Sequence, residues 1–226
     1  MNKLDDCIVS IWKDPDWTSN DIIRYIKPLI SPLKVGHAGT LDPFAEGVLL
    51  VCIGKMTKRA SELMELKKEY YVKIEFGKRT DTLDCTGSVN AIKKYKYFND
   101  KHIISVFNNF LGEIDQIPPM FSALKHKGQR LYSLARKGVI VERKPRKVFI
   151  DSINLLKNNK NSIEISVVCG KGTYIRSLAR DLSHKLNTEG YVVNLIRTRI
   201  GDFNKKKSIN VKDFKDWLLY QHHSQN

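Results

Sequence analysis

The sequence predicts an α+β fold, with a mixed, largely antiparallel central sheet flanked by helices. Residues 48–54 (VLLVCIG) form an unbroken apolar run, which is typical of a buried strand. Residues 69–77 (EYYVKIEFG) alternate in polarity, which is typical of a half-buried strand. Some predicted strands follow one another directly and others are separated by helices, without a strict βαβ repeat. This mixed order favours α+β over a parallel α/β sheet.

Helices are predicted before and after the apolar run. A helix over residues 17–30 starts at a cap formed by Thr18, Ser19 or Asn20, and its isoleucines and leucine recur at helical spacing. Residues 57–67 (TKRASELMELK) predict a short second helix.

The middle of the chain combines a loop, a helix and an insertion. Residues 78–89 predict a polar loop, and residues 100–112 predict an amphipathic helix that ends at Gly112. Residues 117–147 begin with two prolines that prevent a helix, and Gly138 stops two later helical turns. We interpret this segment as a projecting insertion.

The C-terminal part returns to sheet and helix. The predicted elements are strands over residues 147–156 and 162–170, a glycine-led helix over 170–186, a strand over 191–203 and a closing helix over 210–220. No internal repeat and no linker rich in Gly, Ser or Pro occurs. We therefore expect one domain over residues 1–226, with the insertion inside it.

Composition excludes several classes of protein. The four cysteines show no CxxC spacing, which favours buried thiols in a reducing compartment over a disulfide scaffold. The six histidines form no HxH or HExxH pattern, and His222 and His223 lie in a polar tail, so we expect no metal site. No signal peptide and no run of about 18 apolar residues occurs. We expect a cytoplasmic protein without a membrane segment.

The charge indicates a polyanionic partner. The chain carries a formal charge of +15, and residues 125–147 alone hold nine Lys or Arg against one acid, Glu142. A compositional bias towards lysine would spread such charge, whereas a binding surface concentrates it. Nucleic acid is the favoured partner, and a general solubility bias is the alternative.

Residues 36–49 (GHAGTLDPFAEGVL) place one carboxylate, Asp42, among glycines and a proline. Gly36, Gly39 and Gly47 permit close approach of another backbone, or unusual dihedral angles. An aspartate in such a segment either caps a turn or acts in catalysis. These residues alone favour the turn-capping interpretation and leave catalysis as the alternative.

Five blocks of the chain, taken together, resemble one family. They are GHAGTLDPFAEGVL, the EYY and RTDTLDCTG segments of residues 57–87, PPMFSALKHKGQRLYSLARKG, CGKGTYIRSLARDL and LIRTRIGDF. Their order and spacing over about residues 18–203 resemble the TruB family of tRNA pseudouridine synthases. The resemblance implies the pseudouridine synthase catalytic fold and conversion of uridine to pseudouridine in the TΨC loop of tRNA, at position 55 in standard tRNA numbering.

The resemblance also implies roles for single residues. Asp42 matches the catalytic aspartate, and Arg176 matches the arginine that pairs with it. Tyr70 matches the active-site tyrosine that stacks on the target base. The positions matching the uracil pocket and the contact with the flipped-out nucleotide are Tyr174, Leu195 and His37. This chemistry needs no cofactor and no metal, and whether Asp42 acts by a covalent or a glycal route stays open.

Residues 117–147 match the family's insertion that closes over RNA, here called the thumb. Its expected RNA-binding cations, together with Lys58 outside it, are Lys125, Lys127, Arg130, Arg136, Lys137, Arg143, Lys144, Arg146 and Lys147. We expect the T-arm stem-loop of tRNA as partner and a monomeric protein. An RNA-binding or tRNA-folding module without chemistry is the alternative function.

The chain departs from the family pattern in two places. The N-terminal K-P-x-G-x-T-S pattern stands here as KDPDWTSND, one residue longer and without the glycine. The chain also stops about 23 residues after GDF, where many bacterial members carry a PUA domain, so we expect a form that lacks that domain.

Overall fold

Strand β3 (Glu46–Ile53) is the best buried element of the chain. Leu49, Val51 and Ile53 face one apolar cluster, and Val48, Leu50 and Cys52 face another. Burial on both faces explains the unbroken apolar run that predicted this strand.

The computed structural model describes residues 6–223, without the side chains of His222 and His223, for which we predicted no metal site. The chain divides into two units. The first unit runs up to Tyr70 and resumes at Leu195, and the second comprises Tyr71–Asn194. Both boundaries fall inside strands, β4 (Lys68–Phe76) and β12 (Gly190–Ile200). The single catalytic domain stays a prediction.

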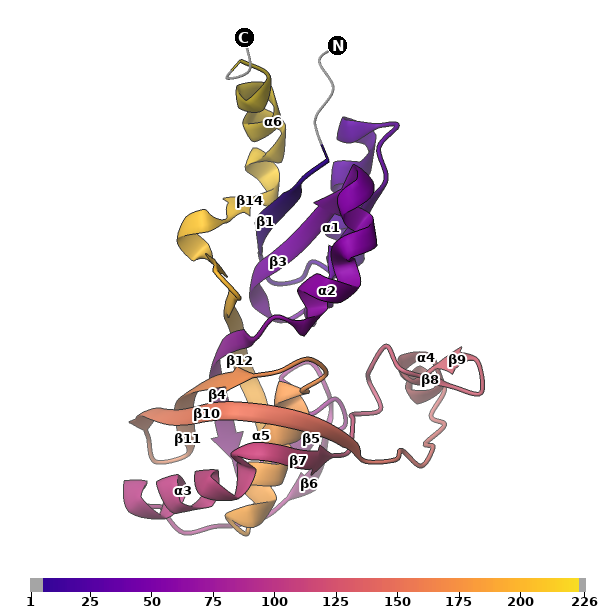
Figure 1. Cartoon of the computed structure of the whole chain (residues 1–226). Helices are drawn as coiled ribbons and strands as arrows, with labels where there is room; N and C mark the ends of the chain where they lie inside the picture. The colour runs from indigo at the N-terminus through magenta and orange to yellow at the C-terminus, as the bar shows by residue number, and fades with distance from the viewer. Residues whose placement is uncertain (1–5, 224–226) are drawn as a thin grey trace. The chain divides into compact units, whose positions relative to one another are not determined.

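The first unit has strands in the order β14-β1-β3-β12, with β2 also paired to β3 and β13 to β12 (Figure 1). β1 and β2 are antiparallel to β3, whereas β12 is parallel to it. The other elements of this unit are β1 (Ile8–Lys13), α1 (Ser19–Ile26), η1 (Lys27–Ile30), β2 (Val35–Ala38), η2 (Gly54–Arg59), α2 (Ala60–Glu65), β13 (Phe203–Asn204), η4 (Lys205–Lys207), β14 (Ile209–Asn210), η5 (Val211–Asp213) and α6 (Phe214–His223).

The second unit has the strand order β4-β11-β10-β7, in which β10 is antiparallel to both neighbours. Helix α3 packs against β10 and α5, and α5 lies across the sheet (Figure 1). The elements of this unit are β5 (Lys78–Thr80), β6 (Val89–Ile92), α3 (Asp100–Phe107), η3 (Asn108–Phe110), β7 (Gly112–Gln116), β8 (Lys125–His126), β9 (Gln129–Arg130), α4 (Leu131–Arg136), β10 (Arg146–Asn158), β11 (Ser162–Cys169) and α5 (Ile175–Lys185).

The thumb projects from the sheet of the second unit on two chain segments (Figure 1). It contains the small hairpin β8–β9 and the helix α4, and Gly138 follows the helix with φ +73°. The predicted two helical turns are confirmed, whereas the hairpin was not predicted.

The mixed, largely antiparallel α+β fold is confirmed, and so are the half-buried strand β4 and the cap at Thr18. Thr18 forms a capping box with Asp21, which selects it over the two neighbouring candidates. In the part of the chain that the structure describes, no helix is long and apolar enough to cross a membrane.

Several predicted boundaries are wrong. The helices predicted over residues 57–67 and 210–220 begin later, at Ala60 and Phe214. Residues 78–89 are not only loop, because β5 and β6 pair there as a hairpin. Helix α3 ends at Phe107, and a 3₁₀ turn separates it from Gly112. Helix α5 starts at Ile175 instead of residue 170, because Tyr174 before it is extended.

Candidate active site

Asp42 lies in the loop that joins β2 to β3. The antiparallel register pairs Ala38 with Leu50, so the chain must reverse over residues 39–45. Leu41 and Ala45 are buried and anchor the loop on either side of Asp42. The carbonyl oxygen of Asp42 accepts a hydrogen bond from the Ala45 amide at 3.1 Å, which closes a turn at the carboxylate. The loop is therefore fixed by burial at both ends.

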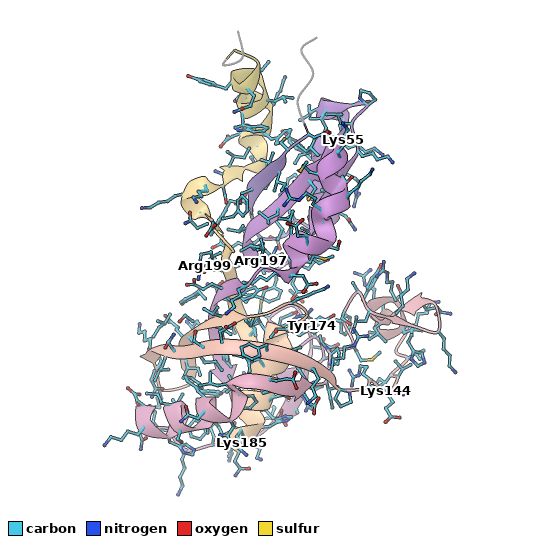
Figure 2. All side chains as sticks on the ribbon, in the orientation of Figure 1. Lys55, Lys144, Tyr174, Lys185, Arg197 and Arg199 are labelled. Atoms are coloured by element: carbon cyan, nitrogen blue, oxygen red, sulfur yellow. The ribbon has the colours of Figure 1, made fainter. Side chains whose placement is uncertain are left out.

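Arg197 holds the first half of this loop through its carbonyl groups. Its side chain is only 1% exposed and reaches from β12, where Figure 2 labels it. Nη2 donates to Gly39 O and Nη1 to Thr40 O, both at 3.2 Å, and Nε donates to Val48 O at 2.7 Å. One rigid guanidinium thus ties the loop to the strand that follows it.

Lys13 holds the second half. Its side chain is fully buried, and Nζ donates to Pro43 O at 3.1 Å and to Asp14 O at 2.9 Å. Burial, and secondly the charge of Arg197, lowers the pKa of Lys13 to about 8, although the negative charge of Asp42 opposes this shift. Asp42 is therefore close enough to Lys13 for their charges to interact.

The segment before α1 braces the same loop. The Asp16 amide donates to Pro43 O at 2.9 Å, and Asp16 has the left-handed φ of +67°. The Leu41 amide donates to Ser19 Oγ at 3.0 Å. The family pattern K-P-x-G-x-T-S has a glycine in this N-terminal segment. Here Asp16 adopts the left-handed conformation that favours glycine.

The glycines of the Asp42 segment have different surroundings. A Cβ on Gly47 would lie 2.3 Å from the Arg197 carbonyl oxygen, so Gly47 permits close packing of β3 against β12. A Cβ on Gly36 would meet nothing within 4 Å. The close backbone approach expected at Gly47 is thus made by the protein's own chain.

His37 lies half-buried in β2, opposite Val51. Burial, followed by the charge of Arg197, lowers the pKa of the His37 ring. Its Nδ1 is buried and has no hydrogen-bond partner among the described residues. The lowered pKa favours the neutral form of the ring, which can stack against a base.

Three further predicted residues belong to the first unit. Tyr70 and Leu195 are buried in β4 and β12. Lys58 is exposed in η2. Burial suits an apolar pocket for the first two, and exposure suits an RNA contact for Lys58.

Arg176 lies in the second unit, in the first turn of α5, and is only 4% exposed. It donates to Thr82 O and Phe121 O at 2.9 Å each and pairs with Asp84 at 3.3 Å. Arg176 is therefore a buried cation and does not lie on the surface of its helix. Asp84, which the sequence analysis did not single out, is buried and accepts hydrogen bonds from Thr82 and Thr86.

Tyr174 caps α5 and is positioned by its backbone (Figure 2). The buried Gln116 side chain accepts from the Tyr174 amide at 2.8 Å and donates to its carbonyl oxygen at 3.1 Å. Ser177 in the same helix donates to Ile117 O at 2.9 Å. The start of α5 is thus tied to β7 and to the base of the thumb.

The thumb cations differ in their surroundings. The exposed ones are Lys125, Lys127, Arg130, Arg136, Lys137, Lys144, Arg146 and Lys147. Lys147 forms ion pairs with Glu113 and Asp115, and these acids raise its pKa. Arg143 is half-buried, and its Nε has no hydrogen-bond partner in the described chain. The exposed cations are the ones best suited to phosphate groups.

No group of three or more His, Cys, Asp or Glu side chains that could hold a metal ion occurs in the described residues. Lys13, Arg197, Asp84 and Gln116 are the residues that sequence reasoning missed. The first three lie inside the quoted motifs, but their partners are distant in the sequence, and only proximity in the fold reveals their contacts.

The chain is similar to known proteins over most of its length. The model of the TruB family pseudouridylate synthase N-terminal domain matches residues 27–175. The tRNA pseudouridine synthase B of Clostridium perfringens is 44% identical over 216 residues, which cover 95% of this chain and 74% of the relative. That of Phocaeicola vulgatus is 41% identical over 227 residues, which cover 98% of this chain and 97% of the relative.

Among solved structures, a chain of a Cbf5-Nop10-Gar1 complex superposes with a TM-score of 0.73 at 27% identity. The match covers 97% of this chain, which spans only 56% of the length of that one. Family model, relatives and fold agree with the ordered motifs around Asp42 and Arg176. This chain belongs to the TruB family of pseudouridylate synthases.

Proposed function

We propose that this chain isomerises uridine to pseudouridine in tRNA, at uridine-55 of the TΨC loop. The reaction breaks the bond between N1 of uracil and C1′ of ribose, turns the base, and joins C5 to C1′. C5 loses its proton to solvent and N1 gains one, so the composition of the nucleotide is unchanged and an ionised carboxylate with proton transfer suffices. The supporting relatives are tRNA pseudouridine synthases B that are 41% and 44% identical to this chain.

Asp42 supplies that carboxylate. The observation that carries this assignment is the loop itself, because the carbonyl groups of Gly39, Thr40 and Pro43 are bonded to buried cations. A loop held in this way fixes the position of the Asp42 side chain. A reaction at a single carbon atom of the ribose requires a carboxylate in one fixed position. A covalent and a glycal route both use a carboxylate at this position.

Arg176 is proposed as the cation that pairs with Asp42 and orients its carboxylate. Its support is the family motif KGTYIR and the burial of its guanidinium among fixed acceptors. An arginine held by two carbonyl groups keeps its guanidinium in one orientation. Tyr70, Tyr174 and Leu195 are proposed to line the uracil pocket, and His37 to contact the flipped-out nucleotide.

The thumb is proposed to bind the T-arm stem-loop of tRNA. Its exposed lysines and arginines displace counterions from phosphates, so tRNA affinity should fall steeply with salt. The target uridine must leave the stack before its C1′ is accessible, and unstacking costs a few kcal/mol. We propose that a monomer in the cytoplasm performs the reaction.

Tritium release from tRNA labelled at C5 of uridine tests the activity. The wild type should release tritium from a tRNA transcript and from a T-arm stem-loop, but not from a transcript with cytidine at position 55. Asp42→Asn, which keeps the size of the side chain, should bind the same RNA and release none.

An RNA-folding module without chemistry gives the opposite result. In that case wild type and Asp42→Asn bind tRNA equally, and neither releases tritium. Tight binding without release by the wild type would therefore exclude the proposed reaction.

A further inference from the structure

A second basic surface lies in the second unit, outside the thumb. The segment between β6 and α3 borders a hollow of about 530 Å³ that is lined by Lys94, Tyr95, Lys96, Phe98, Leu186 and Asn187. None of these residues has a role in the site described above. The hollow joins a basic, aromatic stretch of sequence, KKYKYF, to the end of α5.

The floor of this hollow is a fixed aromatic cluster. Tyr95 and Phe98 stack with ring centres 5.4 Å apart and planes 17° apart, and Phe76 packs edge-on against both. Asn158 Nδ2 donates to Phe98 O at 2.8 Å, and Tyr95 Oη donates to Lys160 O at 3.4 Å. Aromatic faces held before binding are stacking platforms for unpaired bases.

The rim of the hollow is positively charged. Residues 93–98 carry three lysines and no acid. Lys93 is used internally, because Nζ donates to Asn187 Oδ1 at 2.7 Å, whereas Lys94 and Lys96 are exposed. The carboxylate of Glu189 contacts the side chains of Arg79 and His184. Two lysines are therefore available beside a stacking surface.

Helix α5 separates this hollow from the thumb. Its first turn is tied to Ile117 at the thumb base. Its last residue, Lys185, is labelled in Figure 2 and directly precedes Leu186 and Asn187, which line the hollow. Eleven residues of α-helix span about 16 Å. Lys185 and His184 also offset the partial negative charge of the helix end.

We propose that the hollow at residues 93–98 binds a part of the tRNA outside the T arm, with Lys94 and Lys96 on phosphates and the Tyr95–Phe98 pair against an unpaired base. This inference rests on the proposed function, because it takes tRNA as the substrate. RNA is the partner because exposed lysines beside half-buried aromatic rings match a phosphate backbone with a free base.

The test compares two charge-reversed variants on two RNAs. Lys94→Glu with Lys96→Glu changes the hollow, and Lys212→Glu with Lys215→Glu makes the same charge change on exposed lysines of η5 and α6. Affinity is measured for full-length tRNA and for the T-arm stem-loop at several salt concentrations. Thermal melting of each variant checks folding.

The hollow variant should bind full-length tRNA at least about tenfold more weakly than the control variant, with a salt slope lower by about 2, one for each lysine. Both variants should bind the stem-loop equally. Equal tRNA affinity of the two variants overturns the proposal, and so does an equal loss on the stem-loop. Tritium release by the wild type is scored separately, so that failure of the reaction leaves the affinity comparison valid.

Discussion

The Asp42 loop and the thumb are held by different kinds of contact. In the loop, the carbonyl groups of Gly39, Thr40 and Pro43 accept bonds from buried cations, and Leu41 and Ala45 are buried. Of residues 125–147, all of which the structure describes, only Leu131 is buried. The Asp42 loop is packed into a core, whereas the thumb consists of a short hairpin and one helix with mostly exposed side chains.

This difference follows from what each region is proposed to do. A carboxylate that meets one carbon atom loses rate with small displacements, so its loop must be rigid. Binding phosphates needs charge over an area and tolerates local adjustment, because the interaction is long-ranged and not directional. The rigid segment is therefore the loop that carries Asp42, and the exposed positive charge is concentrated on the thumb.

The largest expected effect separates chemistry from binding. Asp42→Asn should lower kcat for pseudouridine formation by about 10⁴-fold or more, because no other group can replace the reacting carboxylate. Its affinity for tRNA should stay within about threefold of wild type, as the thumb is unchanged. Single-turnover tritium release and filter binding measure the two quantities.

Substitutions in the thumb should have the opposite effect, a loss of tRNA affinity with little change in kcat. Replacing the exposed Lys125, Lys137 and Lys144 by glutamine should weaken tRNA binding by about 10²- to 10³-fold at 0.1 M salt and lower the salt slope by about 3. At saturating tRNA, kcat should be within about threefold of wild type. A thumb variant with an unchanged salt slope would contradict the division of labour.

Substituting one glycine with positive φ in each region tests whether the segment around Asp42 is more rigid than the thumb. Gly47→Ala should destabilise the protein by about 3 kcal/mol, because the methyl group meets the Arg197 carbonyl and φ is +121°. Gly138→Ala in the thumb should cost only about 1 kcal/mol, because φ is +73° but the space is open. Chemical denaturation gives both values, and equal costs would remove the contrast.

Lys13 predicts a pH dependence for the core that supports the loop. Its pKa is lowered from 10.5 to about 8. Between these values the unfolded chain holds a proton that the folded protein has lost, so stability rises with pH. Relative to Lys13→Met, the wild type should gain about 1.4 kcal/mol per pH unit above pH 8.

Unfolding free energies at pH 7.0, 8.5 and 9.5 test this, with Lys212→Met as an exposed control that shows no such gain. If the difference between wild type and Lys13→Met is flat over this range, Lys13 is not held as a buried cation beside the loop.

The smallest expected effect concerns Asp16, whose backbone amide donates a hydrogen bond to Pro43 in the Asp42 loop. Asp16→Gly should stabilise the protein by about 0.5–1 kcal/mol, because a residue with φ +67° is strained unless it is glycine. Asp16→Ala should destabilise it, since alanine adopts the left-handed conformation less readily than aspartate does. Denaturant midpoints of the two variants should move in opposite directions.

Much of the fold could be predicted from local pattern. The alternation of Tyr70, Val72, Ile74 and Phe76 predicted β4, because a period of two places one face of a strand inward. The hairpins β5–β6 and β8–β9 were missed, because their strands are only two to four residues long and mostly exposed. So short an element carries no recognisable periodicity.

The sequence by itself determined the α+β class, the family, the basic thumb and the position of Asp42, because each depends on residue types close together along the chain. Only the tertiary structure decided how the Asp42 loop is held, since Lys13 and Arg197 reach it from β1 and β12. It also decided that Asp84 pairs with Arg176, which lies 92 positions further along the chain. Contacts of this kind depend on which strands the fold brings together, and no local pattern records that.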